Sequence, residues 1–194
     1  MTLEQIIERE RERRTEGGQF GIDACKDSIR FYLEHGQSLE EQLDEYVERA
    51  NKDVFFNKHM VLACWEMIEE QKAATTDYFM AMEADSNRGK QISRGQHFAY
   101  RAWRNTVEYG AEMFEAHDIP WGSDLAEGVM ADFINTLRDA GIKTFAVTDH
   151  STALMEGLHA IFATGCTLVG PVVVKRHPPY WGDEEHAGLA FKIN

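Results

Sequence analysis

The sequence predicts an α+β fold in which a mainly helical N-terminal region packs with a small C-terminal β-α-β-β module. Residues 142–175 carry the first observation, because a β-branched run, a segment with helical periodicity and a second β-branched run follow one another there. The second observation is that the roughly 140 residues before this stretch repeat their apolar side chains at helical spacing. We therefore expect a charged helix and turn over residues 1–22, a helical region over 23–140, and an α/β module with two or three strands over 141–194.

Capping residues and glycines mark the ends of the expected helices. Ser38 followed by Glu41 forms a capping box, and Ser93 is the expected N-cap of a later helix. Asp23 is the expected N-cap of an earlier helix, and Gly141 ends the last helix of this region. From these signals and the apolar spacing we expect a linker over 85–90 and helices over residues 3–14, 24–35, 39–50, 54–84, 94–117 and 125–140.

The apolar pattern changes from helical to alternating after residue 141. The pair Gly170-Pro171 interrupts one of the expected strands and indicates a bulge or an edge position. The expected order is a strand over 142–147, a helix capped by Ser151 or Thr152 and ended by Gly165, a strand over 167–175, a long loop over 177–188, and a short strand over 189–193 that can return as a hairpin.

Composition and charge limit the classes of function. The 194 residues carry a formal net charge of −13, which disfavours a general nucleic-acid binder because most of the surface repels phosphate. Three widely spaced cysteines argue against a disulfide framework and for a reducing compartment. No apolar run is long enough for a membrane span, so we expect a cytoplasmic protein without a membrane partner. No pattern predicts a cofactor or a metal ion.

The acidic residues are concentrated in two blocks. Residues 38–85 contain twelve acids and four bases, and residues 108–139 contain eight acids and one base. Such blocks suit a protein that docks on a basic partner, although an acidic surface kept for solubility explains the same composition. Under the docking hypothesis, Tyr180 and Trp181 add an apolar anchor. The acids expected to meet arginine and lysine on the partner are Glu40, Glu41, Asp44, Glu45, Glu48, Glu108, Glu112, Glu115, Asp118 and Asp124.

A basic block separates the two acidic blocks, and it carries a second hypothesis. Its arginine and lysine residues alternate with aromatic side chains, as in protein surfaces on which nucleobases stack. Internal pairing with the acidic blocks on either side is the simpler interpretation, and we favour it over direct DNA binding. The bases concerned are Arg88, Lys90, Arg94, Arg101 and Arg104.

Three groups of residues invite a chemical interpretation. Asp149, His150 and Ser151 are the residue types of a hydrolytic triad, but consecutive residues at a strand end diverge, so a capping role for Ser151 explains them better. The strand end over 148–152, from Thr148 to Thr152, is nevertheless where a small enzyme or ligand-binding protein would have its site. Glu156 and His159 have the spacing of a carboxylate metal helix, without the second copy that a di-iron bundle needs. The loop with Tyr180 offers further metal ligands, but its prolines and aromatics favour an interaction loop: His177, Asp183, Glu184, Glu185 and His186.

A resemblance points to the same class of function as the acidic blocks. The small size, strong acidity, charged helical N-terminus and the C-terminal run LRDAGIKTFAVTDHSTALMEGLHAIFATGCTLVG resemble the accessory proteins of phages and conjugative elements, which include anti-CRISPR inhibitors of Cas9. The resemblance implies a non-enzymatic inhibitor whose acidic faces occupy a basic nucleic-acid channel, such as the channel of Cas9 that holds the guide RNA.

Overall fold

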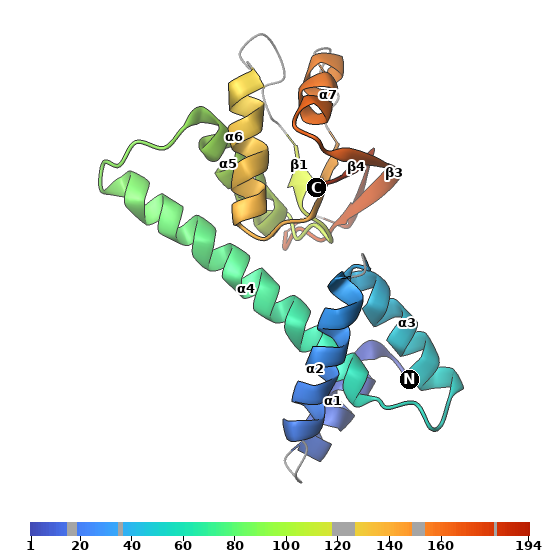
Figure 1. Cartoon of the computed structure of the whole chain (residues 1–194). Coiled ribbons are helices and arrows are strands. Elements are labelled where there is room, and N and C mark those ends of the chain that lie inside the picture. Colours follow the sequence, from blue (N-terminus) through green and yellow to red (C-terminus); the bar gives the residue numbers. More distant parts are fainter. Residues whose placement is uncertain (15–18, 35–36, 118–126, 149–153, 181) are drawn as a thin grey trace. The chain divides into compact units, whose positions relative to one another are not determined.

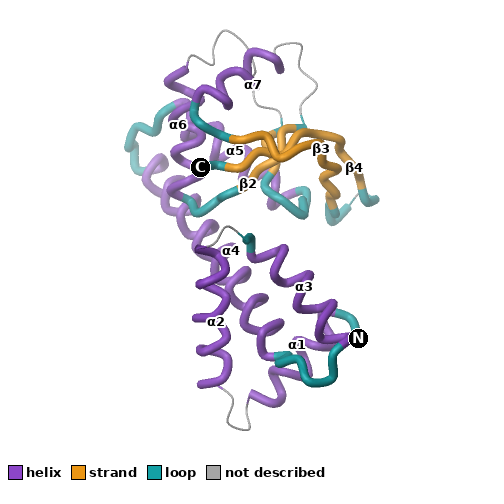
Figure 2. Tube along the Cα trace, turned by 45° about the vertical axis from the view of Figure 1, so that its right-hand side comes forward, coloured by secondary structure: helices purple, strands orange, loops and turns teal. Residues whose placement is uncertain are grey.

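The computed structural model describes residues 1–14, 19–34, 37–117, 127–148, 154–180 and 182–194, and it has the expected α+β fold (Figure 1). The chain forms two compact units, Met1–Ala73 and Ala74–Asn194. All four strands of the described residues belong to the second unit (Figure 2). The division between the units lies within one helix, whereas the sequence placed its boundaries at residues 22 and 140. The difference arises because the helices just before residue 140 share their core with the sheet.

The first unit contains α1 (Leu3–Arg14), α2 (Gln19–Glu34), α3 (Leu39–Lys52) and the beginning of α4 (His59–Asn87). α1 has the expected bounds. α2 begins before Asp23, because Ile22 is fully buried in the helical core and this burial outweighs the capping preference of the aspartate. The core of this unit also contains Ile6, Ile29 and Leu62.

Local capping chemistry is confirmed at α3. The Ser38 hydroxyl accepts a hydrogen bond from the Glu41 amide at 3.1 Å, and the Glu41 carboxylate accepts one from the Ser38 amide at 2.9 Å. α4 begins at His59 and not at residue 54, since the Asp53 carboxylate accepts a bond from the Phe55 amide and holds the chain in a turn. α4 then continues to Asn87, so half of the expected linker is helical.

The second unit contains α5 (Arg94–Glu108), α6 (Glu127–Asp139), α7 (Leu154–Ala163) and four strands: β1 (Glu115–Ala116), β2 (Thr144–Val147), β3 (Thr167–Arg176) and β4 (Glu184–Lys192). Ser93 caps α5 as expected. The expectation that this helix continues to His117 is wrong, because Gly110 takes a φ of +59° and turns the chain into β1.

The strands lie in the order β1-β2-β4-β3. β1 is parallel to β2, while β4 is antiparallel to both β2 and β3. The two β-branched runs predicted as strands are therefore β2 and β3 of one sheet, and β4 lies between them. β3 is an edge strand and carries a register shift between Leu168 and Gly170, which confirms the expected bulge. β4 begins at Glu184, so the loop expected over 177–188 is partly strand.

One face of the sheet forms the core of the second unit. Phe145, Val147 and Phe191 from this face pack with buried side chains of α5, α6 and α7. Figure 2 shows these three helices gathered beside the strands. Burying this face leaves the side chains at alternate strand positions on the other side.

The segment from Tyr109 to Phe114 connects the two edges of the sheet. Ala111 forms an antiparallel bridge with Arg176 of β3, and the Glu112 amide donates to the Lys175 carbonyl at 3.0 Å. At its other end, the Phe114 carbonyl accepts a hydrogen bond from the Ala146 amide of β2 at 2.9 Å. Because this short segment forms hydrogen bonds with β2 and also with the edge strand β3, the sheet must curl. The curl brings β1 close to the C-terminal end of β3.

Candidate functional site

A buried ion pair lies where the sheet curls. Glu115 of β1 is 2% exposed and Arg176 of β3 is 4% exposed. The Arg176 guanidinium donates from Nε to Oε2 of Glu115 at 2.7 Å and from Nη2 to Oε1 at 2.8 Å, a bidentate arrangement. The guanidinium also lies 5.0 Å from the ring centre of Tyr109. These contacts fix the carboxylate of Glu115 in one orientation.

Thr148 and His117 extend this pair towards the surface. Thr148 follows β2, and its buried hydroxyl donates a short hydrogen bond to Oε1 of Glu115. Nδ1 of His117, which follows β1, lies 3.2 Å from the same hydroxyl oxygen. β1 and β2 are parallel, so their carboxyl ends meet at one edge and bring His117 and Thr148 together. The result is a chain of polar contacts from a half-buried imidazole to a buried carboxylate.

His186 of β4 completes the group. Its ring lies edge-on to that of His117, with 5.6 Å between ring centres, and its Nε2 lies 3.2 Å from a carboxylate oxygen of Glu184. One ligand atom from each of Glu115, His117 and His186 lies within 4.8 Å of the other two. We call the five residues Glu115, His117, Thr148, Arg176 and His186 the Glu115 cluster.

A glycine permits this close arrangement of β2 and β4. A Cβ atom built on Gly188 would lie 2.5 Å from the Val147 carbonyl oxygen and 2.8 Å from the Thr148 methyl group. Only glycine fits there without a shift of the backbone. His186, two residues earlier on β4, points to the same face as Gly188 and is thereby held beside His117.

The electrostatics of the Glu115 cluster keep its carboxylate charged. Burial by itself raises the pKa of Glu115, but the hydrogen bonds from Arg176 and Thr148 and the charge of Arg176 outweigh it. The pKa of Glu115 therefore lies below its ordinary value. A fixed carboxylate beneath two partly exposed imidazoles can bind a cation or transfer a proton.

The expectation that Glu115 lies on an exposed acidic face is wrong. Its charge is neutralised by Arg176 within the fold. Neither this pair nor the position of His117 could be inferred from the sequence, because a two-residue strand is too short to show an apolar period. The alternation of Glu115 and His117 around Ala116 was the available signal. Of the strand end over 148–152, the structure describes only Thr148, so Asp149, His150 and Ser151 lie outside the described residues.

The acids of α3 are exposed, as the docking hypothesis requires. Glu40 and Asp44 lie on the same face as Glu41, Glu45 and Glu48, opposite the buried side chains of the helix. Glu41 serves the capping box, and Glu45 and Glu48 form exposed ion pairs with Arg49 and Lys52 of the same helix.

The other acids of the docking hypothesis are dispersed. Glu108 is exposed and lies 3.9 Å from Arg104, and Glu112 is exposed and lies 3.5 Å from His177. Asp118 and Asp124 lie outside the described residues.

Arg88, Lys90 and Arg104 of the basic block pair with acids close to them. Asp85 contacts Lys90 at 2.6 Å and Arg88 at 3.9 Å, and Glu108 contacts Arg104. Asp85 and Glu108 are the adjoining ends of the two acidic blocks, which agrees with internal pairing. Arg94 lies over the ring of Phe98, and Arg101 is exposed.

The loop before β4 holds an exposed pair of charged groups. His177 lies 2.9 Å from Asp183, and the hydrogen bonds to Asp183 and Glu112 raise its pKa above the ordinary value. Tyr180 is 91% exposed, whereas Trp181 lies outside the described residues. Glu185 is exposed on β4, and Glu156 and His159 are exposed on α7.

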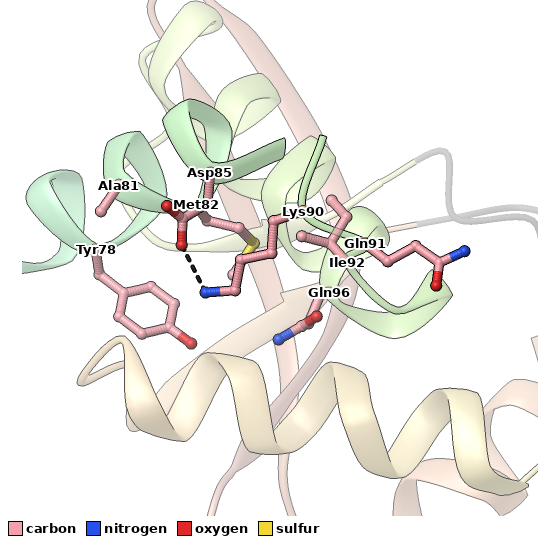
Figure 3. A pocket seen from close by; sticks show the side chains of 8 residues that line it. All are labelled: Tyr78, Ala81, Met82, Asp85, Lys90, Gln91, Ile92 and Gln96. Atoms are coloured by element: carbon pink, nitrogen blue, oxygen red, sulfur yellow. Dashed lines mark hydrogen bonds and ion pairs between the residues drawn. The ribbon is translucent and has the colours of Figure 1, made fainter. Parts of the chain in front are cut away.

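A pocket of about 310 Å³ lies between the end of α4 and the start of α5 (Figure 3). The Lys90–Asp85 ion pair lies within it, and burial together with the charge of Asp139 raises the pKa of Tyr78. Its side chains present no nucleophile with an adjacent base, so it is a weaker candidate for chemistry than the Glu115 cluster. The lining residues are Tyr78, Ala81, Met82, Asp85, Lys90, Gln91, Ile92 and Gln96.

Comparisons with known proteins find a match to one domain family, over slightly less than half of the chain. Residues 98–193 match the model of DUF7698, a domain of unknown function. The match begins within α5 and ends after β4, so it contains the whole Glu115 cluster. No curated protein and no solved structure matches the chain. Among the described residues, no helix is both long enough and apolar enough to cross a lipid bilayer.

Proposed function

We propose that this protein is a non-enzymatic interaction protein that inhibits a basic nucleic-acid-binding protein. The observation that carries the proposal is the exposed acidic face of α3, with Glu40, Asp44, Glu45 and Glu48 over little more than two helical turns. A stripe of this length extends about 12 Å, because a helix rises about 1.5 Å per residue. Several carboxylates of such a stripe can contact an arginine-rich or lysine-rich groove on the partner at the same time.

The existing ion pairs on this face do not prevent binding. Glu45 and Glu48 pair with Arg49 and Lys52, and all four side chains are at least half exposed. Exposed pairs of this kind contribute only about 0–1 kcal/mol, so a partner's arginine can replace the internal base at little cost. The net charge of −13 also speeds association with a positive surface, and salt should slow it.

The finer proposal is an anti-CRISPR protein that acts on Cas9 with its guide RNA. The resemblance to accessory proteins of phages and conjugative elements supports it, as does the basic channel that Cas9 offers to its guide and target. Tyr180 of the second unit is 91% exposed, so it is one aromatic side chain that can make a separate apolar contact with the partner.

Charge reversal on α3 tests the proposal. The variant Glu40→Lys, Asp44→Lys, Glu45→Lys and Glu48→Lys should inhibit DNA cleavage by purified Cas9–guide RNA several-fold less than the natural chain. Glu41 is left unchanged because it caps the helix. The matched control reverses four exposed acids elsewhere and changes the net charge equally: Asp77, Asp139, Glu156 and Glu185.

The control separates a local contact from a general effect of charge. If α3 forms the interface, the control should retain most of the inhibition at moderate salt. Equal losses in both variants would show that only net charge matters, and an unchanged affinity of the α3 variant at low salt would refute the proposal. A natural chain without effect on Cas9 would remove the finer proposal and leave the coarser one to be tested with other basic proteins.

A further inference from the structure

The geometry points to a binding site for a divalent transition-metal ion of the Zn²⁺ class in the Glu115 cluster, with Glu115, His117 and His186 as ligands. This inference goes beyond the proposed function, which uses a different surface and needs no metal. It rests on the distances between the ligand atoms, on the groups that orient each ligand, and on the exposure of the two imidazoles.

The ligand atoms are close enough to be bridged by one ion. One nitrogen of each imidazole and one carboxylate oxygen of Glu115 lie within 4.8 Å of one another. Zinc bonds of about 2.0–2.2 Å in a tetrahedral site place ligand atoms roughly 3.4 Å apart, so each atom would move by less than about 1 Å. His117 and His186 are partly exposed, and rotation of these side chains can supply that movement.

The hydrogen bonds of His117 favour a metal ligand. The Thr148 hydroxyl has one proton and donates it to Glu115, so it must accept from Nδ1–H of His117. This tautomer places the lone pair of His117 on Nε2. Imidazoles that bind metals are usually oriented in this way, with the second ring nitrogen donating to a fixed acceptor.

His186 is oriented by the same principle. Its Nε2 lies 3.2 Å from the Glu184 carboxylate, so Nε2–H donates to that group and the lone pair lies on Nδ1. The ring meets that of His117 edge-on, because Gly188 allows β4 to approach β2 closely. Both imidazoles thus have a neighbour that selects the tautomer needed for coordination.

Glu115 can bind the ion without losing Arg176. A carboxylate has about four lone-pair positions, and the described residues fill three of them, two from Arg176 and one from Thr148. The position left on Oε2 can accept a metal. Two imidazole nitrogens and one carboxylate oxygen form a ligand set that divalent zinc and iron share, with a further position for water or substrate.

Metal titration of the full chain tests the site. Isothermal titration with Zn²⁺ should give one ion per chain, and Co²⁺ should give the visible absorption of a tetrahedral site without a thiolate band, because all three cysteines are buried elsewhere. H117A and H186A should each weaken Zn²⁺ binding by at least about 100-fold, and T148V by about 10–100-fold as the loss of an orienting partner. The matched controls H97A and H159A remove exposed histidines from α5 and α7 and should bind as the natural chain does.

The outcomes separate coordination from adventitious binding. Wild-type affinity in either H117A or H186A would overturn the inference, as would a natural chain that binds no Zn²⁺. A loss of binding in H97A or H159A equal to that in the cluster variants would do the same. H186A leaves the contacts of His117, Thr148 and Glu115 in place, so it is expected to fold even if H117A does not, and far-UV circular dichroism checks this. Because the inhibitory surface on α3 is separate, H186A should still inhibit the basic partner.

Discussion

Substitution by alanine should change the free energy of unfolding in opposite directions at two glycines that occupy equivalent helix positions. Gly95 is the second residue of α5, and Gly128 is the second residue of α6. A Cβ on Gly95 would lie 2.6 Å from the Asp132 Cβ and 2.7 Å from the Phe133 amide nitrogen, and it would also meet the Val129 carbonyl oxygen. A Cβ on Gly128 would meet nothing within 4 Å.

The expected change in stability of each variant follows from this difference in contacts. Alanine at Gly95 must push the α6 backbone away from α5, and overpacking of this kind costs about 1–3 kcal/mol. Three contacts under 3.0 Å, two of them with backbone atoms of α6, put this cost at the upper end of the range. After a gain in helix propensity of up to about 1 kcal/mol, G95A should therefore destabilise the second unit by about 2 kcal/mol. That energy lowers the folding equilibrium constant roughly 30-fold. G128A has only the propensity term and should stabilise by up to about 1 kcal/mol.

Urea unfolding and hydrogen exchange of the full chain measure these changes. Exchange of the amides in α5 and α6, read by mass spectrometry, assigns the effect to the second unit even if the two units unfold separately. G95A should exchange faster than the natural chain in both helices, and G128A should exchange more slowly or at the same rate. A G95A variant as stable as G128A would refute the close approach of α5 and α6.

Two further predictions concern buried ionisable groups. E115Q should destabilise the chain by about 3–5 kcal/mol, because Arg176 would remain buried without its counter-charge. The control E108Q changes an exposed ion pair and should cost less than about 1 kcal/mol. Equal losses of stability in the two variants, measured by urea unfolding, would contradict the buried pair. Burial, with a contribution from the charge of Glu40, raises the pKa of the Cys64 thiol from 9.0 to about 12. The unfolded chain then releases this proton first, so stability is complete below pH 9 and should fall by roughly 1 kcal/mol per pH unit between pH 9 and pH 12. C64A lacks this contribution and should lose less stability over that range, so parallel unfolding profiles of the two chains from pH 8 to 11 would disprove the assignment.

Features set by neighbouring residues could be predicted from the sequence. The serine caps at Ser38 and Ser93, the glycine stop at Gly141 and the bulge beside Gly170 are all present in the structure. Each depends on the conformational preference of one or two residues, which the chain expresses wherever it lies. The α+β class followed from the change of apolar period near residue 141 for the same reason.

Features set by distant pairing could not be predicted in this way. The expected helix over 94–117 ends early because Gly110 turns the chain and the following segment bonds to β3, more than sixty residues later in the sequence. α2 begins before its expected cap because Ile22 finds a place in a core built from other helices. In each case the burial or pairing of a distant segment outweighed a local preference.

The candidate site shows the same limit. Exposed acids on α3 were predictable, since the helix period separates charged from apolar positions. Glu115 was predicted to be an exposed acid like those on α3. Its buried partner, Arg176, lies 61 residues away in the sequence, and no local pattern indicates their pairing.

The sequence by itself determined the class of fold, the starts of the capped helices and the distribution of charge. Tertiary structure decided which carboxylates face solvent and which are buried. For Glu115, burial depends on β1 and β3 meeting where the sheet curls. A strand of two residues has no period of its own, so only its hydrogen bonds to β2 define it. The same curl brings His117 and His186 together from strands that the sequence could not place side by side.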